Sequence, residues 1–522
     1  MRIGIDVGGT NTDAVLMDGD RVVAEIKSST TKDVTSGIVA ALRSLLEQSG
    51  ADRSRIGAVM IGTTHFTNAV VEGSRLLPVA AVRLGLPATL SLPPMVDWPD
   101  RLAAVVGDHR YLCHGGHEFD GRKIAPLDRD ELRRAAEDIA SHGLRTVAIS
   151  SVFSPVSDEF EREAAAVLRE ELPDLSISLS CELGRIGLLE RENATILNAC
   201  LAELATQIVS GFKAALDESG IDAPVYLSQN DGTLMTVDFA ERYPVATFAS
   251  GPTNSMRGAA LLSGRGDCAV VDIGGTTSDV GMLHQGFPRE AKATVEVGGV
   301  RTNFRMPDVL PLGIGGGSRV RENGSVTVGP DSVGYRLQEE ALVFGGETLT
   351  ASDVAVAAGR AAFGDPGRVA ALGRPLVDAA LAYIEASIAE TVDRMKTAPD
   401  AIPVVVVGGG SILLPDTLAG ASELIRPDHF AVANAIGAAI AQVGGEVDRV
   451  FSIGELTREQ ALEQARDEAA ERAVAAGAVS DTVQIVDVEE LALAYVPGNA
   501  VRIKVKAVGD LDVGRDQVAT HR

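Results

Sequence analysis

The sequence has few aromatic residues, few cysteines and too few basic side chains to balance its acidic ones. Aromatic residues make up 4% of the 522 residues, with a single tryptophan, so aliphatic side chains must fill the core. The four cysteines are scattered without a CxxC spacing, which excludes a zinc ribbon and disfavours a disulfide framework. The formal charge of −25 disfavours nucleic acid and anionic membranes as partners.

Long apolar runs are also absent. No uninterrupted apolar stretch approaches the roughly 20 residues that span a bilayer. The first residues enter a strand without the basic and apolar regions of a signal peptide. We therefore expect a soluble, cytoplasmic protein. At about 100–200 residues per domain, the length corresponds to several ordinary domains or two large composite ones.

Short β-branched runs alternate with amphipathic segments along the chain, which is typical of α/β proteins. Buried strands are predicted at 3–7, 58–61, 146–150, 224–227, 269–273 and 403–407. Helical periodicity predicts helices over 34–47, 129–142, 158–171, 376–395 and 458–476, and one long helix over 190–216. Alternation over 483–508 predicts further strands near the end of the chain.

One short pattern occurs twice. Residues 5–13 read IDVGGTNTD and residues 271–279 read VDIGGTTSD, and both follow an apolar strand. Glycine lets backbone N–H groups approach an anion without a Cβ in the way. An Asp beside it suits a Mg²⁺ ion that bridges phosphates. A single copy is more typical of a tight hairpin turn, but the matched pair predicts two loops that grip the phosphates of a nucleotide from both sides.

The residues of these loops have predicted roles. Asp6 and Asp272 are expected to hold Mg²⁺ and to orient water, although each can instead simply cap its turn. Asp13 and Asp279 close the loops, where they either accept hydrogen bonds from loop amides or reach the metal ion. The remaining loop residues are predicted to contact phosphate: Gly8, Gly9, Thr10, Asn11, Thr12, Gly274, Gly275, Thr276 and Thr277.

A third glycine turn follows the strand predicted at 403–407. It consists of Gly408, Gly409, Gly410 and Ser411. Glycines at this point allow a flat ring to lie against the backbone, which predicts the adenosine side of the nucleotide site. A strand–turn–helix connection without a ligand is the alternative.

Thr63, Thr64 and His65 follow the strand predicted at 58–61. Hydroxyl groups beside a titratable imidazole suit a substrate carbonyl or a proton transfer, so we predict a catalytic role. The alternative is that Thr63 or Thr64 caps a helix over 68–72.

His114, His117 and Asp120 form a compact group with Glu118 between them. Imidazole and carboxylate ligands suit a second divalent metal, either Zn²⁺ or Mn²⁺. The alternative is a surface hairpin that ends at the D-G turn of residues 120–121.

The two D-x-G-G-T loops and the late V-G-G-G-S loop, in that order, resemble the actin/hexokinase/Hsp70-like ATPase fold. More closely, the sequence resembles the ATP-dependent hydantoinase/5-oxoprolinase family, hydantoinase A type subunit. Further segments carry this likeness: GTTHFTNA at 62–69, ERENATILNA at 190–199, SGP at 250–252 and GIGGGS at 313–318. The resemblance implies a two-lobed α/β fold with duplicated ribonuclease-H-like subdomains and insertions, and it adds Gly315 and Gly316 to the nucleotide contacts.

The resemblance also implies an activity. This activity is the ATP-dependent ring opening of a cyclic amide such as a hydantoin or 5-oxoproline. The reaction would proceed by phosphorylation of the amide oxygen, and Mg²⁺ would accompany the ATP. It implies a separate partner subunit, a homo-oligomer or both, since full-length 5-oxoprolinases carry a second large half. A small-molecule kinase, an ATP-dependent carboxylase subunit and a non-catalytic, actin-like ATP module are the alternatives. We expect a first lobe over 1–185, a second over 186–450, and a C-terminal helix and strands over 451–522.

Overall fold

The computed structural model describes residues 1–8, 11–29, 34–183, 186–291, 295–304, 306–453, 456–493 and 500–512. In these ranges, no single helix has the length and apolar character needed to cross a membrane. The bent pair α7 (Leu188–Cys200) and α8 (Ala202–Ser219) meets that test of length and composition only when its two helices are joined.

The first lobe is built on a mixed β-sheet. Its strands, in spatial order, are β3 (Arg21–Ser29), β2 (Asn11–Asp18), β1 (Arg2–Val7), β4 (Ala58–Thr63) and β9 (Val225–Ser228). The first three strands pair antiparallel, and β1, β4 and β9 run parallel to one another. Helices α1 (Val34–Ser49) and α8 pack beside this sheet with an apolar core between them.

The second lobe repeats this arrangement. Its strands, in spatial order, are β13 (Phe287–Pro288), β12 (Ser278–His284), β11 (Cys268–Ile273), β19 (Ile402–Val407) and β20 (Ala421–Ile425). Here too the first three pair antiparallel and the last three run parallel. Two sheets with the same order and directions confirm the predicted two-lobed actin/hexokinase/Hsp70-like ATPase fold with duplicated subdomains.

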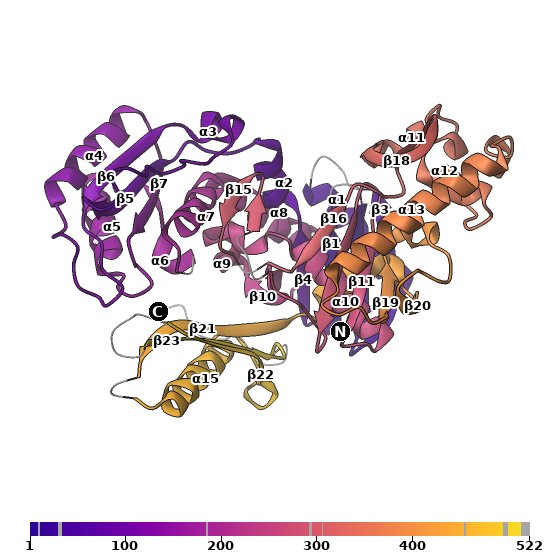
Figure 1. Cartoon of the computed structure of the whole chain (residues 1–522). Coiled ribbons are helices and arrows are strands. Elements are labelled where there is room, and N and C mark those ends of the chain that lie inside the picture. Colours follow the sequence, from indigo (N-terminus) through magenta and orange to yellow (C-terminus); the bar gives the residue numbers. More distant parts are fainter. Residues whose placement is uncertain are drawn as a thin grey trace.

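Each lobe carries an insertion. The first is a parallel sheet of β6 (His109–His114), β5 (Ala80–Leu86), β7 (Thr146–Ser151) and β8 (Ser176–Leu179), with helices α4 (Arg129–Ser141) and α5 (Glu159–Glu171) (Figure 1, left). The second contains β17 (Ser318–Asn323), β18 (Ser325–Ser332), α11 (Leu337–Glu340) and α12 (Ala351–Ala357) (Figure 1, upper right). The long helix α13 (Arg374–Met395) leads from this insertion back to the second sheet.

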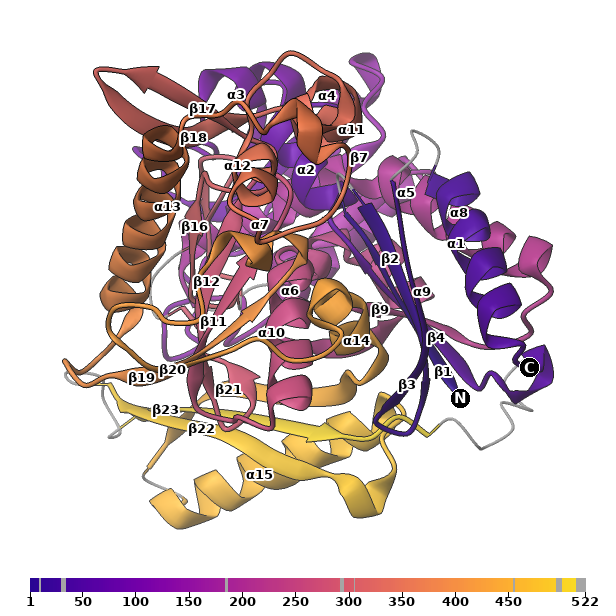
Figure 2. The same cartoon turned by 90° about the vertical axis from the view of Figure 1, so that its right-hand side faces the viewer.

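The C-terminal segment extends the first sheet rather than forming a separate body. Strand β21 (Gln442–Ser452) pairs with β10 (Thr233–Thr236), and it continues into β23 (Ala500–Gly509) and β22 (Gln484–Ala492), which completes a nine-stranded sheet. Helix α15 (Arg458–Ala475) covers this extension with buried alanines, as Figure 2 shows along the lower edge.

The structure also bears on the expected boundaries. A division at residue 186 assigns β9 and β10 to the second lobe, whereas both strands pair within the sheet of the first. A division at residue 451 falls inside β21. The first sheet contains strands from distant parts of the chain, so their order along the sequence does not reveal which strands pair with one another.

The predicted strands and most predicted helices are present at nearly the expected positions. The single helix expected over 190–216 is wrong, since α7 ends at Cys200 and α8 begins at Ala202 with a bend of 56°. The two helices have different neighbours: α7 packs on β7 of the inserted sheet and α8 packs on α1. A straight helix would not reach both surfaces.

Helices α10 (Ser250–Ser263) and α14 (Ala433–Ala439) cross in very close contact between the lobes. A Cβ at Gly258 would lie 1.9 Å from the carbonyl oxygen of Ala433, and one at Gly437 would lie 1.8 Å from that of Asn254. On its other side α14 packs on β1, where a Cβ at Gly4 would lie 2.1 Å from the carbonyl oxygen of Ala435. This packing brings the start of α14 to the end of β1.

Candidate functional site

A cavity of about 560 Å³ lies between the lobes, where the glycine loops of both sheets meet. Gly8 of the first loop and Gly275 of the second both line it, as do the glycines of the third loop. The predicted site residues in its wall are Asp6, Gly8, Asn11, Asp13, Thr64, Asp272, Gly274, Gly275, Thr276, Thr277, Gly316, Gly408, Gly409 and Gly410. Gly9 and Thr10 lie outside the described residues.

The two duplicated loops have the same internal geometry. In the first, the N–H of Gly8 donates to the carbonyl of Asn11 at 3.0 Å. In the second, the N–H of Gly274 donates to the carbonyl of Thr277 at 2.9 Å. A sequence repeat has thus become a structural repeat, with one copy on each side of the cavity.

Asp6 lies at the bottom of the cavity at the end of β1. Its Oδ2 accepts a hydrogen bond from Nδ2 of Asn434 at 2.9 Å. Its Oδ1 is buried and has no hydrogen-bond partner among the described residues. Burial, followed by the negative charge of Asp13, raises the pKa of Asp6 to about 7. The carboxyl group therefore exchanges protons near neutral pH.

Asp13 is held by side chains from two other elements, Lys27 on β3 and Asn434 on α14. Both of its carboxylate oxygens accept hydrogen bonds from Nζ of Lys27 at 2.8 Å, and Oδ2 also accepts one from Nδ2 of Asn434 at 3.0 Å. Asn434 therefore donates to Asp6 and Asp13 through the same nitrogen. Burial raises the pKa of Asp13, against the opposing effect of the Lys27 charge.

Asp272 is the counterpart of Asp6 in the second sheet. Its Oδ2 accepts a hydrogen bond from the hydroxyl of Ser255 at 2.5 Å. Burial raises its pKa. Gly408 has a φ of +82°, and a Cβ there would lie 2.3 Å from Oδ1 of Asp272, so only glycine fits between the third loop and this carboxylate.

The loop at residues 313–318 supports the second D-x-G-G-T loop through backbone hydrogen bonds. Gly316 and Gly317 donate backbone hydrogen bonds to the carbonyls of Gly274 and Gly275 at 3.0 and 2.7 Å. Of the two resemblance-derived residues, Gly316 reaches the cavity, while Gly315 packs against the backbone of Thr276.

Several other predicted residues lie outside the cavity wall. Thr12 and Ser411 are buried beside it. Asp279 is the cross-strand partner of Asp272, and burial together with the charge of Asp272 raises the pKa of Asp279 to about 7. The role expected for these residues in ligand binding stays a prediction.

Thr63 and His65 form a hydrogen-bonded pair behind the cavity. Oγ1 of Thr63 lies 2.7 Å from Nδ1 of His65. Burial and the positive charge of Arg75 lower the pKa of His65 to about 4, so the imidazole is neutral at physiological pH. Helix α2 (His65–Glu72) begins earlier than expected; Thr64 occupies its N-cap position without a side-chain capping bond, and Thr64 and Asn68 face the cavity.

An apolar end of the cavity was not foreseen from the sequence. Phe344 and Phe363 stack with ring centres 5.8 Å apart and ring planes 13° apart, and both line the cavity with Leu337 and Ile412. These aromatic residues come from the insertion in the second lobe and the segment after it. No local motif marks these two residues, and only the folded chain brings them into the wall of the same cavity as the third glycine loop.

The predicted second metal site takes a different form in the structure. The ring of His117 is buried and stacks on Phe160 at 4.6 Å, while Asp120 accepts a hydrogen bond from Arg122 at 2.7 Å. Within the described ranges, the group of three whose possible metal ligands lie within 4.8 Å is His114, Asp128 and Glu131.

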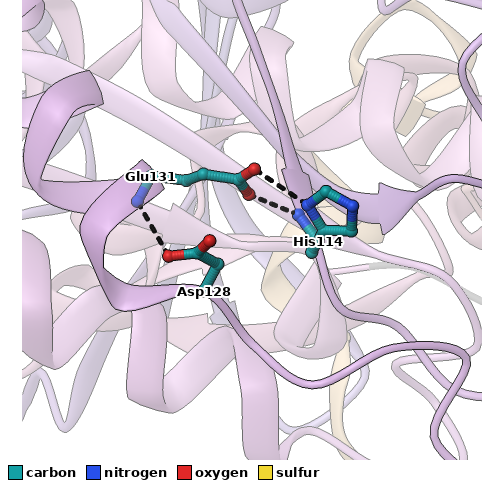
Figure 3. A group of neighbouring side chains, drawn as sticks. All are labelled: His114, Asp128 and Glu131. Atoms are coloured by element: carbon teal, nitrogen blue, oxygen red, sulfur yellow. Dashed lines mark hydrogen bonds and ion pairs between the residues drawn. The ribbon is translucent and has the colours of Figure 1, made fainter.

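Figure 3 shows this group. The Nδ1 of His114 lies 2.8 Å from Glu131, and Asp128 caps helix α4. Hydrogen bonds inside the protein account for these contacts, and a second metal stays a prediction.

Two family models match the sequence. The hydantoinase/oxoprolinase N-terminal region matches residues 2–172, and the hydantoinase/oxoprolinase model matches residues 191–363. Among curated relatives, the caprolactamase subunit alpha of Pseudomonas jessenii is 29% identical over 392 residues, which cover 70% of this chain and 55% of the relative. The acetone carboxylase beta subunit of Xanthobacter autotrophicus is 26% identical over 389 residues, which cover 67% and 53%. The chain thus spans about half the length of these relatives.

Solved structures agree on the fold. The ATP-dependent caprolactamase from Pseudomonas jessenii matches with a TM-score of 0.80 at 19% identity, over 100% of this chain and 89% of that one. A nucleotide-free acetone carboxylase matches with a TM-score of 0.72 at 20% identity over the same shares. With both family models matched in order along the duplicated lobes, the chain belongs to the hydantoinase/oxoprolinase family.

Proposed function

We propose that this chain is the ATP-binding subunit of an enzyme that opens a small cyclic amide, such as a hydantoin or 5-oxoproline. The observation that carries the proposal is the pair of equivalent glycine loops, which line one cavity with Asp6 and Asp272 beneath them. The caprolactamase relative supports the substrate class. In the proposed reaction, one ATP and two water molecules convert the cyclic amide into ring-opened amino acid, ADP and phosphate.

The glycine loops are suited to bind a triphosphate. Among the described residues, the N–H groups of Gly275 and Thr276 have no backbone acceptor, and the hydroxyls of Thr276 and Thr277 add further donors. Such exposed amides form an anion-binding concavity. The stacked rings of Phe344 and Phe363 offer an apolar wall for the adenine base at the far end of the cavity.

Mg²⁺ fits the acidic end of the cavity. Asp6 has a buried oxygen without a partner among the described residues, and Asp272 lies in the same wall. Carboxylate oxygens are the ligands that this ion prefers. Asp6 and Asp272 would hold the ion, and when bound it supplies the positive charge that balances the phosphates.

We place the amide substrate beside α2, where Thr64 and Asn68 line the cavity. Thr64 and Asn68 present a hydroxyl and an amide there, which suit the carbonyl and N–H of a neutral ring. The Thr63 and His65 pair lies directly behind them and would orient this wall. Phosphorylation of the amide oxygen makes the carbon electrophilic, and water then breaks the ring C–N bond.

The relatives are named as subunits, so the proposal includes a separate partner subunit. The carboxylase relatives favour one second candidate, an ATP-dependent carboxylase subunit in which bicarbonate takes the phosphoryl group. The test is to purify the chain with its native partner and to supply ATP with a panel of lactams, hydantoins and ketones. Release of ADP that matches ring-opened product supports the proposal.

Other product patterns would contradict the proposed hydrolase. ADP release that requires bicarbonate and yields a carboxylated product would favour the carboxylase. A stable phosphorylated small molecule would favour a kinase. Slow ATP turnover that no small molecule accelerates would favour a non-catalytic ATP module.

A further inference from the structure

Lys27 is a cation in an acidic cavity. It lies on β3, and among the described residues that line the cavity it carries the one positive charge. The carboxylates of Asp6, Asp13 and Asp272 line the same space. A triphosphate enters such a cavity only at a cost in free energy unless positive charge offsets these carboxylates, and Lys27 would add to the charge that Mg²⁺ supplies when bound.

The ammonium group of Lys27 reaches across the gap between the lobes. Its Nζ donates to both oxygens of Asp13, in the first lobe, and to the carbonyl of Ala431, in the second, at 3.1 Å. A Cβ at Gly409 in the third glycine loop would lie 3.8 Å from Cε of Lys27. The Lys27 side chain is 36% exposed and lines the cavity, while hydrogen bonds to Asp13 and Ala431 fix the position of its Nζ.

We propose that Lys27 binds the phosphate chain of the nucleotide and that Asp13 holds it ready for this contact. The proposal rests on the use of ATP set out under Proposed function and deepens it. With ligand bound, Nζ transfers one of its two hydrogen bonds with Asp13 to a phosphate oxygen, and it keeps the other bond to Asp13 and the one to the carbonyl of Ala431. Lysine is well suited to this task, because its compact ammonium carries three donors.

A purely structural ion pair with Asp13 is the competing explanation. Asp13 is almost fully buried, so removing Lys27 would leave a buried carboxylate without its cation. The two explanations differ in what they predict for ligands that share the adenosine part but differ in phosphate. A phosphate contact affects ATP most and adenosine least, whereas a structural defect weakens all ligands alike.

The experiment is calorimetric titration of the full chain with Mg·ATP, Mg·ADP and adenosine. Lys27→Met is expected to weaken ATP binding by about ten- to a hundredfold, the range for loss of a charged hydrogen bond, and to change adenosine binding less than twofold. Lys27→Arg should recover most of the ATP affinity. Lys213→Met removes a lysine from an exposed ion pair with Asp238, outside the cavity wall, and should change none of these affinities.

Two further variants keep the test decisive if Lys27→Met does not fold. Asp13→Asn retains the ammonium and removes the carboxylate that holds it, so ATP affinity should fall, but by less than in Lys27→Met, with adenosine affinity changed less than twofold. The double variant Lys27→Met with Asp13→Asn leaves no unpaired carboxylate and should still bind ATP weakly. If the Lys27→Met variants bind ATP as tightly as the wild type, or lose as much affinity for adenosine as for ATP, the role of Lys27 is wrong while the proposed function stands. A wild-type chain that binds no adenine nucleotide would overturn the proposed function as well.

Discussion

Asp6 and Asp272 occupy the same place in two separate sheets. Asp6 pairs across its antiparallel ladder with Asp13, and Asp272 pairs in the same way with Asp279. Each also lies beside a parallel strand, where Gly62 and Val407 are the partners. The duplicated fold therefore delivers two carboxylates to one cavity from opposite lobes, that of Asp6 buried and that of Asp272 partly buried.

Replacing either carboxylate by its amide should abolish activity without unfolding the protein. We expect Asp6→Asn and Asp272→Asn each to lower ATP turnover by at least about a hundredfold, as for loss of a group that organises developing charge. The free energy of unfolding should stay equal or rise, because a buried carboxylate is costly to desolvate. Turnover assays and denaturant unfolding measure the two effects. The exposed Asp238→Asn is the control, and wild-type turnover in both site variants would contradict the assignment.

Gly62→Ala should disturb Asp6 through a purely steric effect. A Cβ at this position would lie 2.5 Å from both Oδ1 of Asp6 and Nδ2 of Asn254, which is closer than real Cβ contacts. We expect a loss of about 1–3 kcal/mol in unfolding free energy, as for other overpacked sites, together with weaker binding of Mg·ATP.

The matched control for Gly62 is Gly373→Ala. The atom nearest to a Cβ at Gly373 is 3.8 Å away, so this substitution meets no clash and should leave binding of Mg·ATP unchanged. Because Gly373 is the N-cap of α13, it should cost no more than about 1 kcal/mol in unfolding free energy. If Gly62→Ala and Gly373→Ala change the unfolding free energy and Mg·ATP binding equally, then the neighbours of Gly62 move aside at no cost and the prediction is wrong.

The neutral state of His65 should make the fold sensitive to acid. The pKa of His65 is lowered from 6.5 to about 4 in the folded protein, so the unfolded chain binds the extra proton first as the pH falls. The stability contributed by His65 is complete above pH 6.5 and is lost as the pH drops towards 4. Unfolding of the wild type and His65→Gln at pH 7 and pH 5 measures this, and the variant should lose less stability on acidification. A directly observed titration of His65 near 6.5 would refute the prediction.

The buried ion pair of Arg83 and Glu192 should behave as a unit. Nε of Arg83 donates to Oε2 of Glu192 at 2.7 Å, and the hydroxyl of Ser150 donates to the same oxygen at 2.6 Å. Removing one partner, by Arg83→Met or Glu192→Gln, should lower the unfolding free energy by about 3–5 kcal/mol, since the other charge stays buried. The double variant should lose much less than the two losses combined. Additive losses in this double-mutant cycle would show that the pair is not coupled.

Much of the fold and half of the site follow from local sequence. The D-x-G-G-T motifs at Asp6 and Asp272 predict a strand, a glycine turn and a second strand, and these contacts form between residues close together in the chain. Their repetition predicts two similar lobes. The β-branched runs that mark β1 and β11 are likewise a local property, and nearly all residues of both strands are buried.

Lys27, Asn434 and the pair of Phe344 and Phe363 are different, because no local pattern marks them as part of a site. Lys27 meets Ala431, and Asn434 meets Asp6, only because α14 packs between β1 and α10 at glycines that permit very close contact. Similarly, the bend between α7 and α8 arises from the different surfaces that each helix covers. The order of residues thus determined the two D-x-G-G-T loops, whereas long-range packing decided which charges and which aromatic rings surround them.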